Sequence, residues 1–150
     1  MKIAITGHKT VRLRGQEKKV AEWIYNELKA AYMENGKFEC LCGGAEGTDE
    51  LFAEIVAFGD LDLDLIFYLP CEGYRYFALE KYMEKAVRNV YMFSKWAYGL
   101  EGIRDRKMVD DCDILYAVWD GVRVGGTWDT IKYAQEKRKH IIFIDREVFK

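Results

Sequence analysis

Residues 38–59 read FECLCGGAEGTDELFAEIVAFG and place an apolar run, a glycine-rich turn and a helical pattern in that order. The run from Phe38 to Cys42 lacks clean alternation, which is typical of a strand covered on both faces of a parallel sheet. The turn from Gly43 to Asp49 contains three glycines, and glycine allows positive φ and the close approach of a ligand. This stretch therefore predicts a strand that leads through a ligand-binding turn into a helix.

The helix after this turn is predicted from one apolar stripe that stops at Gly59. Thr48 and Asp49 are both acceptable N-caps, so we expect one of them to cap the helix. The stripe consists of Leu51, Phe52, Ile55 and Val56.

The same unit of strand and helix recurs along the chain. Further strands are predicted over Lys2 to Thr6, Leu63 to Leu69, Ile114 to Trp119, Ile141 to Ile144 and, as a sixth candidate, Asn89 to Phe93. Further helices are predicted over the stripe from Val20 to Ala31, which Gly36 ends, and over Tyr76 to Val87, Ile103 to Asp111 and Thr127 to Lys139. This alternation predicts one Rossmann-like α/β domain over residues 1–150. Its doubly wound, mainly parallel sheet of five or six strands would carry helices on both faces, with right-handed crossovers.

Three turns that contain glycine are expected at one edge of this sheet. In a doubly wound sheet, ligands bind beyond the carboxyl ends of the strands, where these turns would lie. Helix amino termini present unpaired N–H groups and partial positive charge, which suit phosphate. We therefore predict a nucleotide-like ligand. The turns are Thr6 to Lys9, Gly43 to Asp49 and Gly125 to Thr130.

The residues predicted to bind this ligand come from the three turns and from nearby segments. Glycine amides and threonine hydroxyls are expected to hold phosphate, with Arg104 adding charge. Acidic side chains and His8 are expected to contact a sugar, and Tyr74 or Tyr76 would stack on a base. The full set is Thr6, Gly7, His8, Arg12, Gly43, Gly44, Ala45, Glu46, Gly47, Thr48, Asp49, Pro70, Tyr74, Arg104, Gly125, Gly126, Thr127 and Thr130.

Several classes of site are disfavoured by the motifs that are missing. No Lys-Ser or Lys-Thr pair follows the glycines, which argues against P-loop hydrolysis of ATP. The chain shows no Ser-His-Asp triad or nucleophile elbow. Two histidines and four scattered cysteines lack metal-ligand spacing, so we expect no metal site, no cofactor and reduced, buried thiols. The cysteines are Cys40, Cys42, Cys71 and Cys112.

The net charge of −2 and the pI near 5.8 argue against broad electrostatic binding of nucleic acid. The chain starts directly with a strand and contains no apolar run of about 20 residues, so we expect a cytoplasmic protein that does not enter a membrane. A homodimer is also considered, with the aromatic segment from Tyr91 to Trp96 as interface or core.

The ordered motifs of the chain resemble those of the SLOG superfamily, and within it the YpsA and YoqJ group of small bacterial and phage proteins. The motifs are Ile5 to His8, Gly43 to Asp49, Tyr68 to Pro70, Arg104 to Val109 and Gly125 to Thr130. The resemblance spans nearly the whole chain. It implies a Rossmann-like fold that binds nucleotides or nucleotide-derived ligands.

Members of this superfamily differ in activity. Lonely-guy enzymes cleave the N-glycosidic bond of nucleoside monophosphates, DNA-processing protein A binds single-stranded DNA, and other members sense NAD-derived signals. The lonely-guy pattern Pro-Gly-Gly-x-Gly-Thr-x-x-Glu is only partly present, since Val124 replaces the proline, Thr127 directly follows the glycine pair, and Asp129 is the nearest carboxylate.

Three functions follow as hypotheses. The first is binding of a nucleotide or nucleotide-derived ligand, such as a nucleotide sugar or an NAD-derived signal. The second is cleavage or transfer at an N-glycosidic bond, with Glu46, Asp49 or Asp129 as the catalytic carboxyl group. The third is a module that binds single-stranded nucleic acid, against which the acidic net charge argues.

Overall fold

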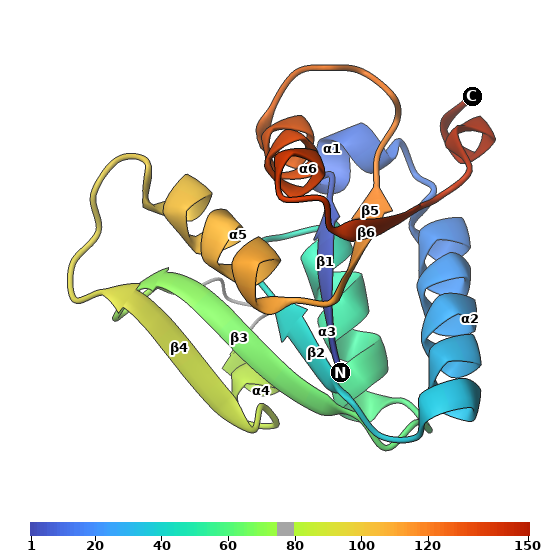
Figure 1. Ribbon diagram of the computed structural model, residues 1–150, viewed down its shortest axis with the longest axis horizontal. Helices are drawn as coiled ribbons and strands as arrows, with labels where there is room; N and C mark the ends of the chain where they lie inside the picture. The colour runs from blue at the N-terminus through green and yellow to red at the C-terminus, as the bar shows by residue number, and fades with distance from the viewer. Residues whose placement is uncertain (75–79) are drawn as a thin grey trace.

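The computed structural model describes residues 1–74 and 80–150, and its centre is a parallel β-sheet (Figure 1). Within these residues the sheet has six strands in the order β4-β3-β2-β1-β5-β6, and every neighbouring pair is parallel. The strands are β1 (Lys2–Gly7), β2 (Glu39–Cys42), β3 (Asp64–Cys71), β4 (Arg88–Phe93), β5 (Ile114–Val118) and β6 (His140–Phe143).

The helices cover both faces of the sheet (Figure 1). One face packs against α2, α3 and α4, and the other packs against α5 and α6. The helices are α1 (Thr10–Leu13), α2 (Glu17–Asn35), α3 (Thr48–Phe58), α4 (Glu80–Met83), α5 (Leu100–Asp111), α6 (Gly126–Glu136) and the 3-10 helix η2 (Arg146–Phe149).

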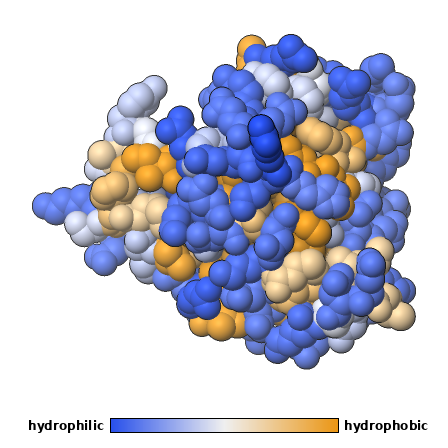
Figure 2. All heavy atoms as spheres, viewed as in Figure 1, coloured by the Kyte–Doolittle hydropathy of each residue, from blue (hydrophilic) through white to orange (hydrophobic). Residues whose placement is uncertain are grey.

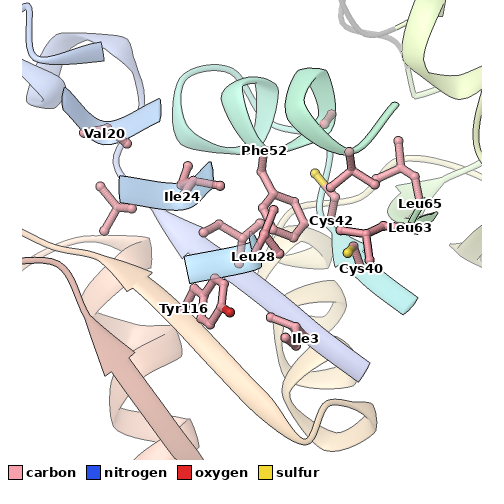
Figure 3. Close-up of a cluster of buried hydrophobic side chains, with 14 of the residues drawn as sticks. Ile3, Val20, Ile24, Leu28, Cys40, Cys42, Phe52, Leu63, Leu65 and Tyr116 are labelled. Carbon is pink, nitrogen blue, oxygen red and sulfur yellow. The ribbon is translucent and has the colours of Figure 1, made fainter. Parts of the chain in front are cut away.

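Two buried clusters form the core, one on each face. Since side chains alternate along a strand, Ile3 of β1 points into the larger cluster, while Ala4 points into the smaller one. Figure 3 shows Phe52 of α3 and Leu28 of α2 directed into the larger cluster, near Ile3. On the face seen in Figure 2, hydrophilic residues predominate and hydrophobic residues lie in patches between them. No helix among the described residues is both long and apolar enough to cross a bilayer.

The fold class predicted from the sequence is confirmed: the chain has an all-parallel, Rossmann-like α/β sheet. All six strands form, each within two residues of its predicted ends. In the described part of the helix predicted over Tyr76 to Val87, only Glu80–Met83 is helical. Residues 75–79, and with them the proposal for Tyr76, lie outside the described residues. The helices α1 and η2 were not predicted.

The predicted N-caps of α3 were wrong. Gly47 occupies the N-cap position with φ +81°, and Thr48 and Asp49 lie in the first turn of the helix. The same arrangement recurs at α6, where Gly125 is the N-cap with φ +91° and Thr127 is already helical. Both caps have a backbone conformation that favours glycine.

The direction in which the strands are added reverses next to β1. From β1 the chain adds β2, β3 and β4 on one side, and it then returns to add β5 and β6 on the other. The switch point therefore lies between β1 and β5. Ligands of such sheets bind outside the carboxyl ends of the strands at this point.

Candidate functional site

A cleft of about 330 Å³ lies beyond the carboxyl end of β1, next to the switch point. All three predicted turns border it: Thr6, Gly7 and His8 from the first, Ala45 and Asp49 from the second, and Gly126 and Thr127 from the third. The side chains of Lys9, Arg12, Glu101, Arg104 and Asp105 also line this cleft. The structure thus brings together segments that are more than 100 residues apart in the sequence.

The first turn of α6 offers free hydrogen-bond donors at one side of the cleft. Within the described residues, no group accepts from the backbone N–H of Gly126, Thr127 or Trp128, whereas the N–H of Asp129 bonds to the carbonyl of Gly125 at 3.1 Å. A Cβ added at Gly126 would meet no other atom within 4 Å. The space above these amides is therefore open, and the helix dipole favours an anion there.

Two threonine hydroxyl groups also lie at the cleft. Thr6 and Thr127 are 8% and 9% exposed as residues, and both line the cavity. Neither hydroxyl forms a hydrogen bond with any residue in the described part of the chain. Neither oxygen atom is fully buried, so both hydroxyls are available to a bound ligand or to water.

The turn from Gly43 to Asp49 forms hydrogen bonds that hold the protein together. The backbone N–H and the hydroxyl of Thr48 both donate to the carbonyl of His8, at 3.1 and 2.9 Å. The N–H of Ala45 donates to the carboxylate of Asp49 at 3.1 Å. Gly43, Gly44 and Gly47 are buried in this framework, so the turn shapes the wall of the cleft, to which it contributes Ala45 and Asp49.

Close packing explains why positions 7 and 47 are glycines. A Cβ at Gly7 would lie 2.5 Å from the side chain of Thr48, and a Cβ at Gly47 would lie 2.7 Å from the carbonyl oxygen of His8. The end of β1 and the start of α3 can therefore approach each other only because neither position has a side chain.

Arg104 lies at the bottom of the cleft, where it is 3% exposed. Its guanidinium donates to the backbone carbonyl of Gly43, to that of Tyr68 at 3.4 Å and to the carboxylate of Asp105 at 2.6 Å. These bonds connect α5 to the ends of β2 and β3. The donors of Arg104 are thus largely occupied by the protein itself, although the sequence suggested phosphate as their partner.

Asp49 is the buried carboxyl group of the cleft. Burial raises its pKa to about 7, against the opposing effects of the Arg104 guanidinium and of the hydrogen bond from Ala45. Burial also raises the pKa of the neighbouring Asp105, which accepts a hydrogen bond from Thr130 at 3.4 Å. A carboxyl group with a pKa near neutrality can exchange a proton with a bound molecule.

His8 and Asp120 join the two strands at the switch point. The backbone N–H of Asp120 donates to Nε2 of His8 at 3.0 Å, an arrangement that favours the neutral ring, whereas the Asp120 carboxylate, 3.2 Å from the same nitrogen, favours the charged ring. Burial lowers the pKa of His8 against the opposing effect of the Asp120 carboxylate. That carboxylate accepts two bonds of 3.0 Å from Arg12, which also donates to the carbonyl of Val124.

Sequence reasoning missed four residues around the cleft. Lys9 and Asp105 lie within quoted motifs, Glu101 lies two residues before the helix predicted from Ile103, and Asp120 follows the apolar run of β5. A polar residue directly after a strand that ends at the switch point was the signal for Asp120. The lining residues Glu101 and Asp105 needed the orientation of α5, which one sequence does not give.

Five further predicted residues do not line the cleft, although Tyr74 is close enough to interact electrostatically with Arg104 and Asp49. Glu46 accepts a 3.5 Å bond from the Thr10 hydroxyl, Pro70 is buried within β3, and Tyr74 borders a separate cavity beside Trp96. Asp129 is exposed, and its carboxylate lies 3.6 Å from the ammonium of Lys132. Thr130 and Asp129 line a second cavity, between α5 and α6.

Two tryptophans stack beside the amino terminus of α6. The ring centres of Trp119, which follows β5, and Trp128 are 5.2 Å apart, and their planes differ by 11°. The guanidinium of Arg123 lies 5.3 Å from the centre of the Trp128 ring. No cluster of metal-ligating side chains occurs in residues 1–74 and 80–150.

Comparisons with solved structures agree on the fold. Structural-genomics target TM1055 matches with a TM-score of 0.63 and 16% identity over 93% of this chain and 71% of that one. DNA processing protein A (DprA) from Streptococcus pneumoniae gives 0.68 and 15% over 96% of this chain and 50% of that one. DprA from Helicobacter pylori, described by its single-stranded DNA binding mode, gives 0.66 and 17% over 97% of this chain and 65% of that one.

The chain therefore spans half to about two thirds of the DprA chains that it matches. No family model matches the sequence, and no curated protein matches it. At this level of identity the likeness shows the fold, and it is the Rossmann-like fold that the SLOG motifs implied.

Proposed function

We propose that the cleft binds a nucleotide or a nucleotide-derived ligand, with a phosphate group at the amino terminus of α6. The observation that carries this proposal is that two kinds of free hydrogen-bond donor border the same cavity. The unpartnered N–H groups of α6 and the unpartnered hydroxyls of Thr6 and Thr127 border the same space at the switch point. Such donors match the oxygen atoms of a phosphate.

The charges of the cleft suit a ligand with one phosphate group whose other groups are uncharged. Arg12 is paired with Asp120, and Arg104 is paired with Asp105, so these two cations are already balanced. Lys9 lines the cleft without an ion-pair partner among the described residues. Its ammonium group can attract a phosphate bound in the cleft. The carboxyl group of Asp49 would accept a hydrogen bond from a sugar hydroxyl.

Gly126→Ala tests the proposal directly. Gly126 lines the cleft, and a Cβ there would meet no other atom within 4 Å, so a methyl group would take up space in the cleft without overlapping the protein. Calorimetric titration with nucleoside monophosphates, the matching nucleosides and inorganic phosphate should show binding that requires phosphate. We expect Gly126→Ala to weaken monophosphate binding by at least about tenfold.

Gly102→Ala is the matched control. Gly102 also lies in a helix, its Cβ would also meet nothing, and it does not line the cleft. Its affinity for monophosphates should equal that of the wild type. Equal binding of nucleosides with and without phosphate, or an unaffected Gly126→Ala variant, would contradict the proposal.

Cleavage of an N-glycosidic bond is the second candidate, and the position of Asp49 favours it. Its buried carboxyl group lines the cleft with a pKa of about 7, so at neutral pH it can donate a proton to a departing base. Incubation with nucleoside monophosphates and chromatography would detect the released base. Asp49→Asn should abolish release while binding persists, and absence of any released base would leave only the binding function.

Single-stranded nucleic acid is a third candidate because the DprA of Helicobacter pylori, which shares this fold, is described as binding single-stranded DNA. This likeness weakens the argument against nucleic acid that was drawn from net charge. A thermal shift produced by an oligothymidylate, lost as salt is raised, would favour this candidate over a free nucleotide.

A further inference from the structure

The outer edge of β6 has no partner strand among residues 1–74 and 80–150. β6 is the last strand of the sheet, and β5 pairs with its other edge. The residues of β5 from Leu115 to Val118 are buried, whereas every residue of β6 is partly or fully exposed. This edge of the sheet is therefore open to solvent, unlike the strand beside it.

The open edge offers backbone groups to a further strand. The N–H of Ile144 donates to the carbonyl of Ala117 in β5 at 3.0 Å. Because successive residues of a strand direct their backbone groups to opposite sides, the N–H and C=O groups of Ile141 and Phe143 point away from β5. No other group in the described part of the chain bonds to them. Such an edge can pair with an extended chain.

Aromatic side chains lie beside this edge. Phe143 is 42% exposed, and its ring centre lies 6.1 Å from that of Trp119, which stacks on Trp128. Trp119 and Phe143 also line a cavity of about 400 Å³ at the carboxyl end of β6, which Arg146 borders. An added strand would thus find a pocket for an apolar side chain next to its backbone partners.

Three cations around the edge lack an acidic partner within the described ranges. Arg138 precedes β6, Arg146 follows it and Arg123 lies over the indole ring in α6, and their guanidinium groups form no ion pair there. The acidic residues after β6 are engaged. The Asp145 carboxylate accepts the N–H of Glu147 at 3.0 Å, and the Glu147 carboxylate lies 3.1 Å from an ammonium group. The surroundings of the edge therefore complement a carboxylate-rich partner.

We infer that β6 accepts an extended, acidic segment of another protein as an added strand. Its apolar side chains would pack against Trp119 and Phe143, and its carboxylates would lie at Arg138 and Arg146. The open ladder favours a peptide over a nucleic acid, because a nucleic acid cannot continue a row of N–H and C=O groups. The inference goes beyond the proposed function and does not depend on it, since none of these four residues lines the cleft.

A peptide whose sequence reads the same in both directions tests the inference for either strand direction. The probe is fluorescein-labelled Asp-Glu-Val-Thr-Phe-Thr-Val-Glu-Asp, and the control peptide has lysine in place of each acidic residue. Fluorescence anisotropy should give a Kd below about 1 mM for the acidic peptide and binding at least about tenfold weaker for the lysine peptide.

Two N-methylated forms of the acidic peptide test strand addition itself. One carries N-methyl groups at the valines and the phenylalanine, and the other carries them at the threonines. Because alternate amides of an added strand face β6, one form should bind at least about tenfold more weakly than the unmodified peptide, and the other should bind with similar affinity.

Two variants test the two kinds of contact. Arg146→Glu should weaken binding of the acidic peptide about fivefold or more and strengthen that of the lysine peptide. Phe143→Thr keeps a residue that favours strands and should weaken binding of the acidic peptide about tenfold. Lys18→Glu is the matched control, because it reverses another exposed cation, in α2, and it should leave both affinities unchanged. Thermal unfolding shows that each variant is folded.

The inference is overturned if the acidic peptide does not bind at about 1 mM, if the lysine peptide binds equally well, or if both N-methylated forms bind like the unmodified peptide. A concentration-dependent dimer in light scattering that excludes the peptide would overturn it by assigning the edge to a second copy of this chain. Displacement of the peptide by an oligothymidylate would overturn it in favour of nucleic acid.

Discussion

At the scale of single residues, Asp49 shows how the fold alters a carboxyl group that the sequence presents as an ordinary acid. Its pKa is raised by burial from 3.8 to about 7. The folded state therefore retains a proton that the unfolded chain releases above pH 3.8. The contribution of Asp49 to the free energy of unfolding is therefore largest at low pH, and it decreases as the pH rises from about 4 to about 7.

Asp49→Asn should remove this pH dependence. The amide can still accept the Ala45 hydrogen bond, and it has no charge to bury. Relative to the wild type, the free energy of unfolding of the variant should rise between pH 4 and pH 7 by up to about 4 kcal/mol, and it should stay constant above that range. Urea unfolding at several pH values measures it.

Asp120→Asn is the contrasting control. Its hydrogen bonds from Val122 and Arg12 lower the pKa of Asp120 although burial raises it. Its own stabilising contribution is complete above pH 3.8, and its carboxylate also raises the pKa of His8. The variant should therefore be less stable than the wild type at every pH, by a constant amount only above about pH 7, where His8 is neutral. Loss of stability in Asp49→Asn at pH 7, as in Asp120→Asn, would contradict the buried, protonated state of Asp49.

Two glycines of the cleft should respond oppositely to a methyl group. In Gly7→Ala the methyl carbon would lie 2.5 Å from the Thr48 side chain, and this overpacking should cost about 1–3 kcal/mol of stability. In Gly126→Ala it meets nothing, so stability should be unchanged or slightly higher. Thermal unfolding of both variants compares them, and equal losses would show that the end of β1 is not closely packed against α3.

The residues of the site could be predicted from the sequence only in part. Glycine turns after apolar runs indicated Thr6, Gly126 and Thr127, which line the cleft. The partners of Arg104 could not be predicted, because its carbonyl acceptors belong to Gly43, just after β2, and to Tyr68 in β3, far from α5 in the sequence. Contacts of this kind depend on tertiary packing, and no local pattern records them.

At the scale of elements, Arg104 connects α5 to the ends of β2 and β3. Arg104→Met would leave the Asp105 carboxylate and the Gly43 carbonyl without their buried partner, so we expect a loss of about 3 kcal/mol or more in the free energy of unfolding. Arg106→Met, on the exposed side of the same helix, should change it by about 0.5 kcal/mol at most. Denaturant titration distinguishes them, and a similarly small effect of both would refute this structural role.

The elements themselves were largely predictable, and their ends were less so. Buried strands such as Ile114–Val118 are apolar runs that are too short for helices, so the sequence identified them. The start of α3 was misjudged because threonine is a common N-cap residue. The hydroxyl of Thr48 instead donates to the backbone carbonyl of His8, just after β1. A four-residue helix such as α1 has too few positions to show a period.

At the scale of the whole molecule, the order of the strands explains why distant turns meet. Local patterns predicted that the turns would share one edge, and the reversal beside β1 brings those of β1 and β5 together. The sequence could not give the cavity between α5 and α6, because its shape depends on how two helices pack against each other.

The reactivity of the four cysteine thiols would show whether the molecule unfolds as one unit. All four are buried as free thiols, and burial raises the pKa values of Cys40, Cys42 and Cys112, the last to about 11. In the native protein we expect a colorimetric disulfide reagent to label them only at the rate of unfolding, and all four at once in denaturant. Rapid labelling of any thiol without denaturant would show that part of the core opens independently.

The stack of Trp119 on Trp128 has a practical consequence. Two parallel indole rings at 5.2 Å couple their electronic transitions, so the protein carries its own optical reporter. Trp128 is the next residue after Thr127, and one ring is attached to the end of a strand while the other is attached to a helix. Any guest that shifts the helix against the strand will change the paired circular-dichroism bands, so occupancy can be followed in unlabelled protein.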